Sequence, residues 1–262
     1  MTSNVIVKQI NGGPIGVKNA IINGNFGINQ RGVSGTVTLS AGAYGHDRWK
    51  AGASGCTYTF ATSENVTIIT ISAGSLIQVV EDINLLTDTY TLSWTGTAQG
   101  KIGAGSFGGS GITGSVTGGS HLNIEFNTGT VSLVQLERGT VATPFEFRSI
   151  GQELALCQRY FQRISGFVCA TGGITNGCAA SIMYKTEMRS SPSVALTAPL
   201  QITRLAVVDY TQSSANISIS AGGARINNLG VSLNFENFTG LPTDTPLPAI
   251  VIGGILTLSS EL

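Results

Sequence analysis

The chain has 262 residues, of which 14 are Lys or Arg, 14 are Asp or Glu and 35 are Gly. This length is sufficient for two domains of ordinary size, each with its own buried core. Residues 1–150 and residues 151–262 are each electrically neutral, so the sequence offers no basic surface for a phosphate backbone, and nucleic-acid binding is not expected.

Residues 1–18 are predicted to form an N-terminal attachment arm. A short apolar run, residues 5–7, is followed by Gly-Gly-Pro at 12–14, which interrupts any regular element. From residue 19 to residue 147 the pattern changes to short strands separated by turn signals. The predicted strands are 36–39, 57–60, 65–71, 76–80, 90–94, 121–126 and 131–137. Seven or more short strands at this spacing predict a β-sandwich or a jelly roll.

Two of these strands alternate between apolar and polar residues. In 90–94 and 122–126 every second residue is apolar, so one face of each strand is expected to pack and the other to meet water. Between them, residues 100–120 contain nine glycines, more than a packed strand tolerates. We expect this segment to be a long loop or an irregular, glycine-rich hairpin.

A connecting helix is predicted over residues 148–164. Pro144 disfavours helix at the residue before it, and Ser149 with Gln152 forms the S-x-x-Q pattern of a capping box. The helix places apolar residues at spacings of four and three, which is a short heptad seam. The seam consists of Ile150, Leu154, Cys157, Phe161 and Ile164. It is too short to be stable alone, so it either packs on the chain's own sheet or meets the same helix of neighbouring subunits at an axis.

Residues 165–262 are predicted to form a C-terminal β domain. Strands are expected at 167–169, 179–184, 193–196, 205–208, 216–220, 231–235, 250–252 and 255–258, and prolines at 192, 199, 242, 246 and 248 punctuate them. No second helix is predicted. The expected fold is therefore all-β, a jelly-roll sandwich joined by one helix to a second, smaller β-sandwich domain.

The low charge of the chain predicts association with other subunits. Only 11% of the residues are charged and 42% are hydrophobic, which leaves more apolar surface than a well-solvated monomer carries. No apolar run reaches the roughly 18 residues of a membrane span, and residues 1–8 lack the pattern of a signal peptide. We expect a homo-oligomer that is made in a cytosol and does not insert into a membrane.

The sequence contains no recognisable catalytic or metal-binding pattern. His46 and His121 lie in different predicted elements without ligand spacing for zinc. The segment 103–108 matches G-x-G-x-x-G but no helix follows it, so we reject a dinucleotide site. No G-x-S-x-G elbow is present. The acidic residues recur without a visible pairing for glycoside cleavage, so the prediction is no enzyme activity, no cofactor and no bound metal.

The four cysteines, at 56, 157, 169 and 178, form no C-x-x-C pair. A cytosolic origin favours reduced thiols, with a bridge between Cys169 and Cys178 as the less favoured alternative.

Sugar binding without cleavage requires less than catalysis does. It needs a shallow sheet face, one or two exposed aromatic rings and flanking hydrogen-bond partners. The candidates are Tyr44, Tyr58, Trp49 and Trp94. Strand periodicity favours a core position for Trp94, so Tyr44 and Tyr58 are the candidates expected to be exposed.

Several motifs together resemble a known family. They are Asn19-Ala-Ile-Ile-Asn-Gly-Asn-Phe26, Asp47-Arg-Trp49, Gln135-Leu-Glu137, Ala142-Thr-Pro-Phe-Glu146 and Gly151-Gln-Glu-Leu-Ala-Leu-Cys-Gln-Arg-Tyr160. In this combination the chain resembles tailed-bacteriophage virion proteins, namely tail fibres, head fibres and related spikes. The front half of that family is similar to the jelly-roll carbohydrate-binding modules of glycoside hydrolases. The resemblance covers residues 19–163.

The resemblance implies a structural protein of the virion, made in the host cytoplasm. It implies a homotrimer, an N-terminal arm that binds other virion proteins, and attachment to host-surface polysaccharide. It also implies a framework role for Trp49. A structural calcium is common in the related modules, with Asn25 and Glu137 as possible oxygen ligands here, but the strand that usually supplies an acidic ligand begins at Gly129 without one, so no metal is expected. The alternative is a capsid or tail decoration protein without a receptor role.

Overall fold

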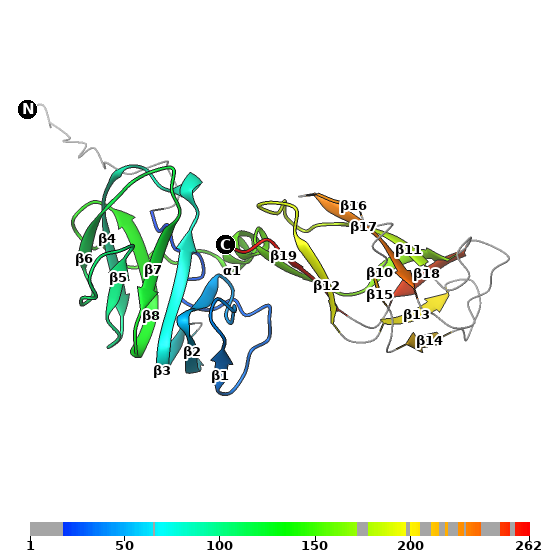
Figure 1. The fold of residues 1–262 in the computed structure, drawn as a ribbon, viewed down its shortest axis with the longest axis horizontal. Coiled ribbons are helices and arrows are strands. Elements are labelled where there is room, and N and C mark those ends of the chain that lie inside the picture. Colours follow the sequence, from blue (N-terminus) through cyan, green and yellow to red (C-terminus); the bar gives the residue numbers. More distant parts are fainter. Residues whose placement is uncertain are drawn as a thin grey trace, which may run out of the picture. The chain divides into compact units, whose positions relative to one another are not determined.

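The structure, a computed structural model, describes residues 18–64, 66–171, 178–197, 200–204, 211–214, 218–219, 225–227, 229–236, 247–251 and 255–262. It divides into two compact units, unit 1 (Met1–Ser149) and unit 2 (Ile150–Leu262). Regular structure in the described ranges is almost entirely strand, with one α-helix, so the all-β class is confirmed (Figure 1). The predicted arm, apart from Lys18, the predicted strand at 205–208 and the side chains of Cys169 and Cys178 lie outside the described residues.

Unit 1 is built from eight strands. These are β1 (Val37–Leu39), β2 (Trp49–Ser63), β3 (Val66–Val80), β4 (Asp88–Thr95), β5 (Gly100–Ile102), β6 (Ile112–Val116), β7 (Leu122–Phe126) and β8 (Gly129–Arg138), with a 3-10 helix, η1 (Asp82–Asn84), after β3. Hydrogen bonding follows the order β1-β2-β3-β8-β4-β6, and β7 joins β3 to β5. The two strands predicted at 65–71 and 76–80 form one continuous strand, β3.

The long strands β2 and β3 each contribute to two layers. β3 pairs with β8 through Ile69–Ile71 and with β7 through Leu76–Val80. Between these halves the register of β2 against β3 slips after Ala51, and such a bulge bends a hairpin. Gly74 stands at this bend with φ +71°, and the carbonyl of Gly55 approaches so closely that a Cβ would not fit. The bend therefore places the two halves of the hairpin in different layers.

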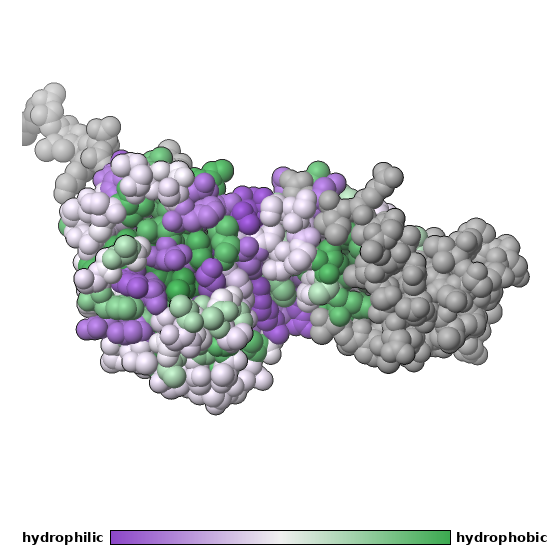
Figure 2. All heavy atoms as spheres, in the orientation of Figure 1, coloured by the Kyte–Doolittle hydropathy of each residue, from purple (hydrophilic) through white to green (hydrophobic). Residues whose placement is uncertain are grey.

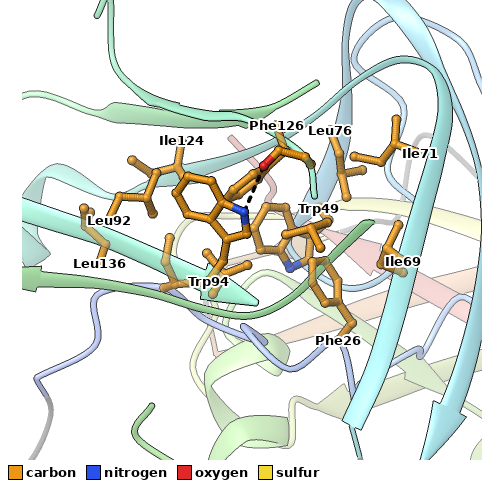
Figure 3. Packing of buried hydrophobic residues seen from close by; sticks show 14 of the residues in the cluster. Phe26, Trp49, Ile69, Ile71, Leu76, Leu92, Trp94, Ile124, Phe126 and Leu136 are labelled. Carbon is orange, nitrogen blue, oxygen red and sulfur yellow. Dashed lines mark hydrogen bonds between the residues drawn. The ribbon is translucent and has the colours of Figure 1, made fainter. Parts of the chain in front are cut away.

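The core of unit 1 lies between these layers. The indole of Trp94 on β4 meets the ring of Phe126 on β7 edge to face, with centroids 5.1 Å apart. Leu92 and Leu136 approach from the β4–β8 side, and Ile124 from β7 (Figure 3). Complete burial of one such side chain contributes about 1.5–3 kcal/mol. The predicted alternation in β4 and β7 is confirmed, because their apolar positions point into this shared core.

The glycine-rich segment is neither of the two predicted forms. It contains β5 and β6, which pair not with each other but with β7 and β4, so the segment crosses between the layers. Glycine is required there by close packing. A Cβ on Gly100 would stand 2.8 Å from the ring of Phe126 and 3.0 Å from Trp94, and one on Gly114 would stand 3.2 Å from Ile102.

Unit 2 begins with the helix α1 (Ile150–Gln158) and continues as strands. They are β9 (Phe161–Ile164), β10 (Phe167–Thr171), β11 (Cys178–Met183), β12 (Ser193–Thr197), β13 (Leu200–Arg204), β14 (Thr211–Ser214), β15 (Ser218–Ile219), β16 (Arg225–Ile226), β17 (Gly230–Glu236), β18 (Leu247–Val251) and β19 (Ile255–Ser259). One sheet has the order β14-β13-β18-β10-β11-β17-β15, with β16 also on β17, and a second has the order β12-β19-β9.

The predicted heptad seam is wrong. The helix ends at Gln158, and Phe161 and Ile164 lie on strand β9. Cys157, Phe161 and Ile164 are buried within unit 2, whereas Ile150 is 66% exposed and Leu154 is only partly buried. The side of α1 that is buried includes Glu153 and Gln158 instead. Cys157, Phe161 and Ile164 therefore pack within the chain's own unit 2, while contact of this helix with neighbouring subunits stays a prediction.

Long-range pairing explains why the helix stops early. β9 pairs antiparallel with β19, so that Ile164 lies opposite Leu256 and Phe161 opposite Ser259. The buried amide of Gln162 donates to the carbonyl of Gln158 at 3.0 Å and to that of Thr186 at 2.8 Å. The bond to the carbonyl of Gln158 supplies a partner at the end of the helix, where carbonyls have none within the helix. Tertiary pairing thus overrides the local helical pattern.

Candidate functional site

The motifs at 19–26 and 47–49 lie against each other in the fold. The Asn23 side chain donates to the carbonyls of Ile28 and Asp47, at 2.8 and 3.0 Å, and accepts from the backbone N–H of Ile28 at 2.9 Å. The indole N–H of Trp49 donates to the carbonyl of Asn23 at 3.0 Å. The Arg48 guanidinium reaches the carbonyl of Val79 at 2.6 Å. All these polar groups are buried, and they fix the loop that leads into β2.

The motifs at 135–137 and 142–146 form a second, partly buried polar network, which we call the clasp. It consists of Asn19, Gln135, Glu137, Thr143, Glu146 and Arg148. Glu137 accepts hydrogen bonds from the backbone N–H of Thr143 at 2.8 Å, from its hydroxyl at 2.7 Å and from the amide of Gln135 at 2.7 Å. The Gln135 amide oxygen accepts from the N–H of Glu146 at 2.9 Å. The segment after β8 is thereby held against β8.

The clasp also holds the start of the described chain. The backbone N–H of Asn19 donates to Glu146 at 2.9 Å, and the Asn19 side chain bonds to the backbone of both Val134 and Leu136, each at 3.0 Å. Arg148 donates to the carbonyls of Asn19 and Ile21. Residues of three of the resembling motifs therefore join the first described residues of unit 1, and the segment after β8, to β8.

These contacts bear on the possible calcium ligands. Both carboxylate oxygens of Glu137 accept hydrogen bonds from protein donors, and the Asn25 side chain accepts from the N–H of Gly27 at 3.2 Å. No group of three or more His, Cys, Asp or Glu side chains in the described ranges is arranged to hold a metal ion. The chemistry of Glu137 here is that of a hydrogen-bond acceptor.

Three of the four aromatic candidates are buried. Trp49 and Tyr58 are 0% exposed and Trp94 is 7% exposed. The core position predicted for Trp94 is confirmed, but the exposure predicted for Tyr58 is wrong, because Tyr58 shares the core-facing side of β2 with Cys56. Tyr44 is the one member of this set that reaches the surface. The structure therefore does not bring the four residues together as one sugar-binding surface.

Tyr58 is instead the partner of a buried histidine. Its hydroxyl lies 3.0 Å from Nδ1 of His46, and the imidazole packs edge to face against the rings of Phe26 and Phe60. Burial lowers the pKa of His46 to about 4 and raises the pKa of Tyr58 to about 12. Both groups are therefore neutral at physiological pH, and they serve the core.

One face of the unit 1 sheet brings partly exposed charged and aromatic side chains together. Six residues stand side by side across the sheet on its outer face, and we call them the cross-strand row. They are Tyr44, Lys50, Ile77, Glu125, Lys101 and Phe107. Lys50, Ile77, Glu125 and Lys101 are direct neighbours on β2, β3, β7 and β5. Tyr44 is bridged to Lys50, and the bridge between Gly100 and Gly108 sets Phe107 opposite Lys101. Five gaps of about 4.8 Å make the row about 24 Å long.

Charged groups and aromatic rings are paired along the row. Lys101 Nζ lies 2.8 Å from Glu125 and 4.8 Å from the ring centroid of Phe107. At the other end the ring of Tyr44 has Arg31 at 5.1 Å and Lys50 at 5.9 Å. Glu125 also accepts from the Ser75 hydroxyl at 2.6 Å. Burial raises the pKa of Glu125, but the bonds from Lys101 and Ser75 outweigh it and lower that pKa overall.

Sequence reasoning missed Phe107. It is 38% exposed and lies in the glycine-rich segment, which has no apolar periodicity. The one available signal for its exposure was its sequence context. An aromatic residue flanked by glycines and serines has no neighbouring apolar residues in sequence to form a buried face with. The cross-strand neighbours of Lys101 are set by long-range pairing and had no local signal.

Other features of unit 1 provide less for a ligand. A groove of about 390 Å³ opens between the turn after β5, β6 and the start of β7. Its lining is backbone and small side chains together with Ile102, Leu122 and His121, so it presents no aromatic ring. In the orientation of Figure 2, hydrophilic and hydrophobic groups are intermixed over unit 1.

Many acidic side chains serve as acceptors in the fold. Asp47 is fully buried and accepts from the backbone and side chain of Gln30, at 2.6 and 2.8 Å. Asp88 pairs with Arg138 at the surface. These contacts, like those of Glu137, use the carboxylates to position neighbouring segments.

Comparison with known proteins identifies no relative: no protein-family profile, curated protein or solved structure matches the chain. No helix in the described ranges is both long and apolar enough to cross a membrane.

Proposed function

We propose that the chain is a structural, non-enzymatic subunit of a tailed-phage fibre or spike that attaches the particle to glycan on the host surface. In this proposal unit 1 is a jelly roll similar to carbohydrate-binding modules, and the ligand lies along the cross-strand row. The observation that carries the proposal is this row, in which Tyr44 and Phe107 bracket three charged side chains and one apolar one. Aromatic faces with flanking hydrogen-bond groups on a shallow surface are suited to sugar rings.

The motif residues support the jelly-roll part of the proposal by their position. Those at the loop before β2, and Asn19, Gln135 and Glu137 in the clasp, are buried and hold the framework of unit 1. The resemblance therefore concerns the scaffold, and the row is the part of that scaffold available to a ligand.

Assembly into a homotrimer, with the arm at residues 1–18 on other virion proteins, is the second part of the proposal. Its support is the low charge of the chain together with exposed apolar side chains in one short stretch. Val141 is 73% exposed and Phe147 65%, and both lie in unit 1. Apolar groups exposed in sequence proximity favour a contact with another subunit. These two residues replace the predicted heptad seam as candidates for that contact.

The attachment proposal is tested with the labelled full-length chain on an array of bacterial surface polysaccharides. We expect saturable binding to at least one polysaccharide, competed by the same glycan in solution. Binding to none of them would reject the adhesin and favour the alternative, a decoration or adaptor protein that binds other virion proteins.

Light scattering of the purified chain tests the assembly separately. We expect a trimer that persists on dilution and that is weakened by Phe147→Asp, with Ile83→Asp, which is on η1, as the matched control at another exposed apolar position. A stable monomer would reject the trimer without affecting the glycan proposal.

A further inference from the structure

The accessible charge along the cross-strand row is positive on balance. Lys50 and Lys101 contribute two cations to the row, against the one carboxylate of Glu125. Beside the row, Arg31, whose side chain is 14% exposed, lies 3.8 Å from the buried carboxylate of Asp47. A surface with this balance attracts anions and repels a second acidic surface.

The cations are not scattered over the row. Each end of it has an aromatic ring with a cation at its face: Lys101 at Phe107, and Arg31 and Lys50 at Tyr44. A neutral sugar would stack on the rings without forming an ionic contact with the cations. A sugar that carries an acidic group would place its apolar ring face on the aromatic ring and its anion on the neighbouring cation.

We propose that the cross-strand row binds an acidic polysaccharide, whose negatively charged pyranose units occupy the Tyr44 end and the Phe107 end. The inference rests on the proposed function and narrows it from glycans in general to anionic ones. The row is long enough for both ends to contact the same polymer chain, since its two aromatic rings are separated by five interstrand gaps of about 4.8 Å.

Glu125 gives the inference a distinctive consequence. Its carboxylate holds Lys101 at 2.8 Å, and it would stand beside the anion of the ligand. Replacing it with the isosteric amide retains an oxygen for the Ser75 bond and releases Lys101. Glu125→Gln is therefore expected to tighten binding of an acidic sugar several-fold while leaving a neutral sugar unaffected.

The test uses the full chain and three defined polymers, with dissociation constants from isothermal titration calorimetry. The probes are an oligogalacturonate, the same oligosaccharide with its carboxyl groups reduced to alcohols, and a poly(glycerol phosphate) without pyranose rings. We expect the oligogalacturonate to bind at least about tenfold more tightly than either of the others, since about 1.4 kcal/mol of charge or stacking energy gives that factor. Its affinity should fall with added salt.

Three variants locate the site. Phe107→Ala and Lys101→Gln are each expected to weaken oligogalacturonate binding about tenfold, and Ile83→Ala, at a position 76% exposed outside the row, should leave it unchanged. Circular dichroism of each variant checks that unit 1 remains folded.

Each result tests a separate part of the proposal. Equal affinity for the reduced polymer would overturn the acidic preference and leave a glycan function in place. Equal affinity for poly(glycerol phosphate) would overturn the role of the rings. Unchanged binding by Phe107→Ala and Lys101→Gln, weaker binding by Glu125→Gln, or no binding of the oligogalacturonate would overturn the site itself, while the polysaccharide array still decides the proposed function independently.

Discussion

The clasp and the cross-strand row lie in the same unit and use polar side chains in opposite ways. In the clasp the carboxylate of Glu137 is buried and meets three donors from its own chain. In the row the carboxylate of Glu125 is partly exposed, with one cation and one hydroxyl as partners. The clasp resides in recognisable motifs, whereas the row has none.

In such a chain, motifs in the sequence mark the framework more readily than they mark a ligand-binding surface. Buried polar groups require specific partners, so their residue types are constrained and leave motifs in the sequence. A shallow surface for ligand requires only that suitable groups come together, and the cross-strand register does that for residues as far apart as Tyr44 and Phe107. Motif residues such as Trp49 are consequently candidates for stability, and residues such as Phe107 for binding.

The largest loss of stability is expected from the substitution of Trp49. Trp49→Ala removes a fully buried indole and its bond to the carbonyl of Asn23, and should lower the free energy of unfolding by about 4 kcal/mol. Urea unfolding followed by the fluorescence of Trp94, the other tryptophan of the chain, measures this in unit 1. Trp49→Phe, which keeps a ring and loses the bond, should lose less. A loss below about 1 kcal/mol for the alanine variant would contradict the framework role.

The second largest loss of stability is expected at low pH, where His46 becomes protonated. Its pKa is about 4 in the folded protein and about 6.5 in an unfolded chain. Between these values the unfolded state binds more protons, so stability is complete above pH 6.5 and decreases as the pH falls toward 4. The loss reaches about 3 kcal/mol. Urea midpoints measured from pH 7 to pH 4 test it.

His46→Phe is the matched control for that pH series. It removes the titrating group from an aromatic pocket formed by Phe26 and Phe60, so the slope between pH 6.5 and pH 4 should largely disappear. The lowered pKa of Glu125 acts in a separate window, because the stability it contributes is lost only as the pH falls below about 4.5. An unchanged slope in His46→Phe would show that another group is responsible.

A smaller effect is expected from the clasp. Glu137→Gln removes the carboxylate charge and one of its two acceptor oxygens, which weakens the bonds from Thr143 and Gln135. The free energy of unfolding should fall by about 2 kcal/mol. Glu64→Gln, in the exposed turn between β2 and β3, provides the same chemical change without such contacts and should stay within about 0.5 kcal/mol. Equal effects of the two substitutions would argue against the clasp.

Much of the strand pattern could be predicted from the sequence, for physical reasons that particular residues illustrate. Alternation placed Tyr90, Leu92 and Trp94 on the core face of β4, because a half-buried strand has a period of two. The same reasoning failed at α1, where the apolar spacing that continued to Ile164 looked helical. Pairing with β19, whose sequence lies about 90 residues further along, decided that segment, and no local window contains this information.

The site could be predicted only in part. Tyr44 was identified, but Tyr58 was assigned to the surface because a tyrosine in a strand can face either side, and its inward position depends on His46 across the loop before β2. The neighbours of Phe107 depend on β5, which glycine content had argued against. In both cases the missing information is register, which hydrophobic pattern specifies only where one face is buried.

The smallest expected effect on stability is the sharpest test of the comparison between the clasp and the row. Phe107→Ala and Lys101→Gln alter an exposed ring and a partly exposed ion pair, which contribute little to folding in solvent. Each should change the free energy of unfolding by no more than about 0.5 kcal/mol, measured by the same urea experiment as Trp49→Ala. A loss of 2 kcal/mol or so, as large as that expected for the clasp, would mean that the row also holds the fold. Its aromatic rings and cations would then belong to the framework, and the reason for assigning a ligand to them would disappear.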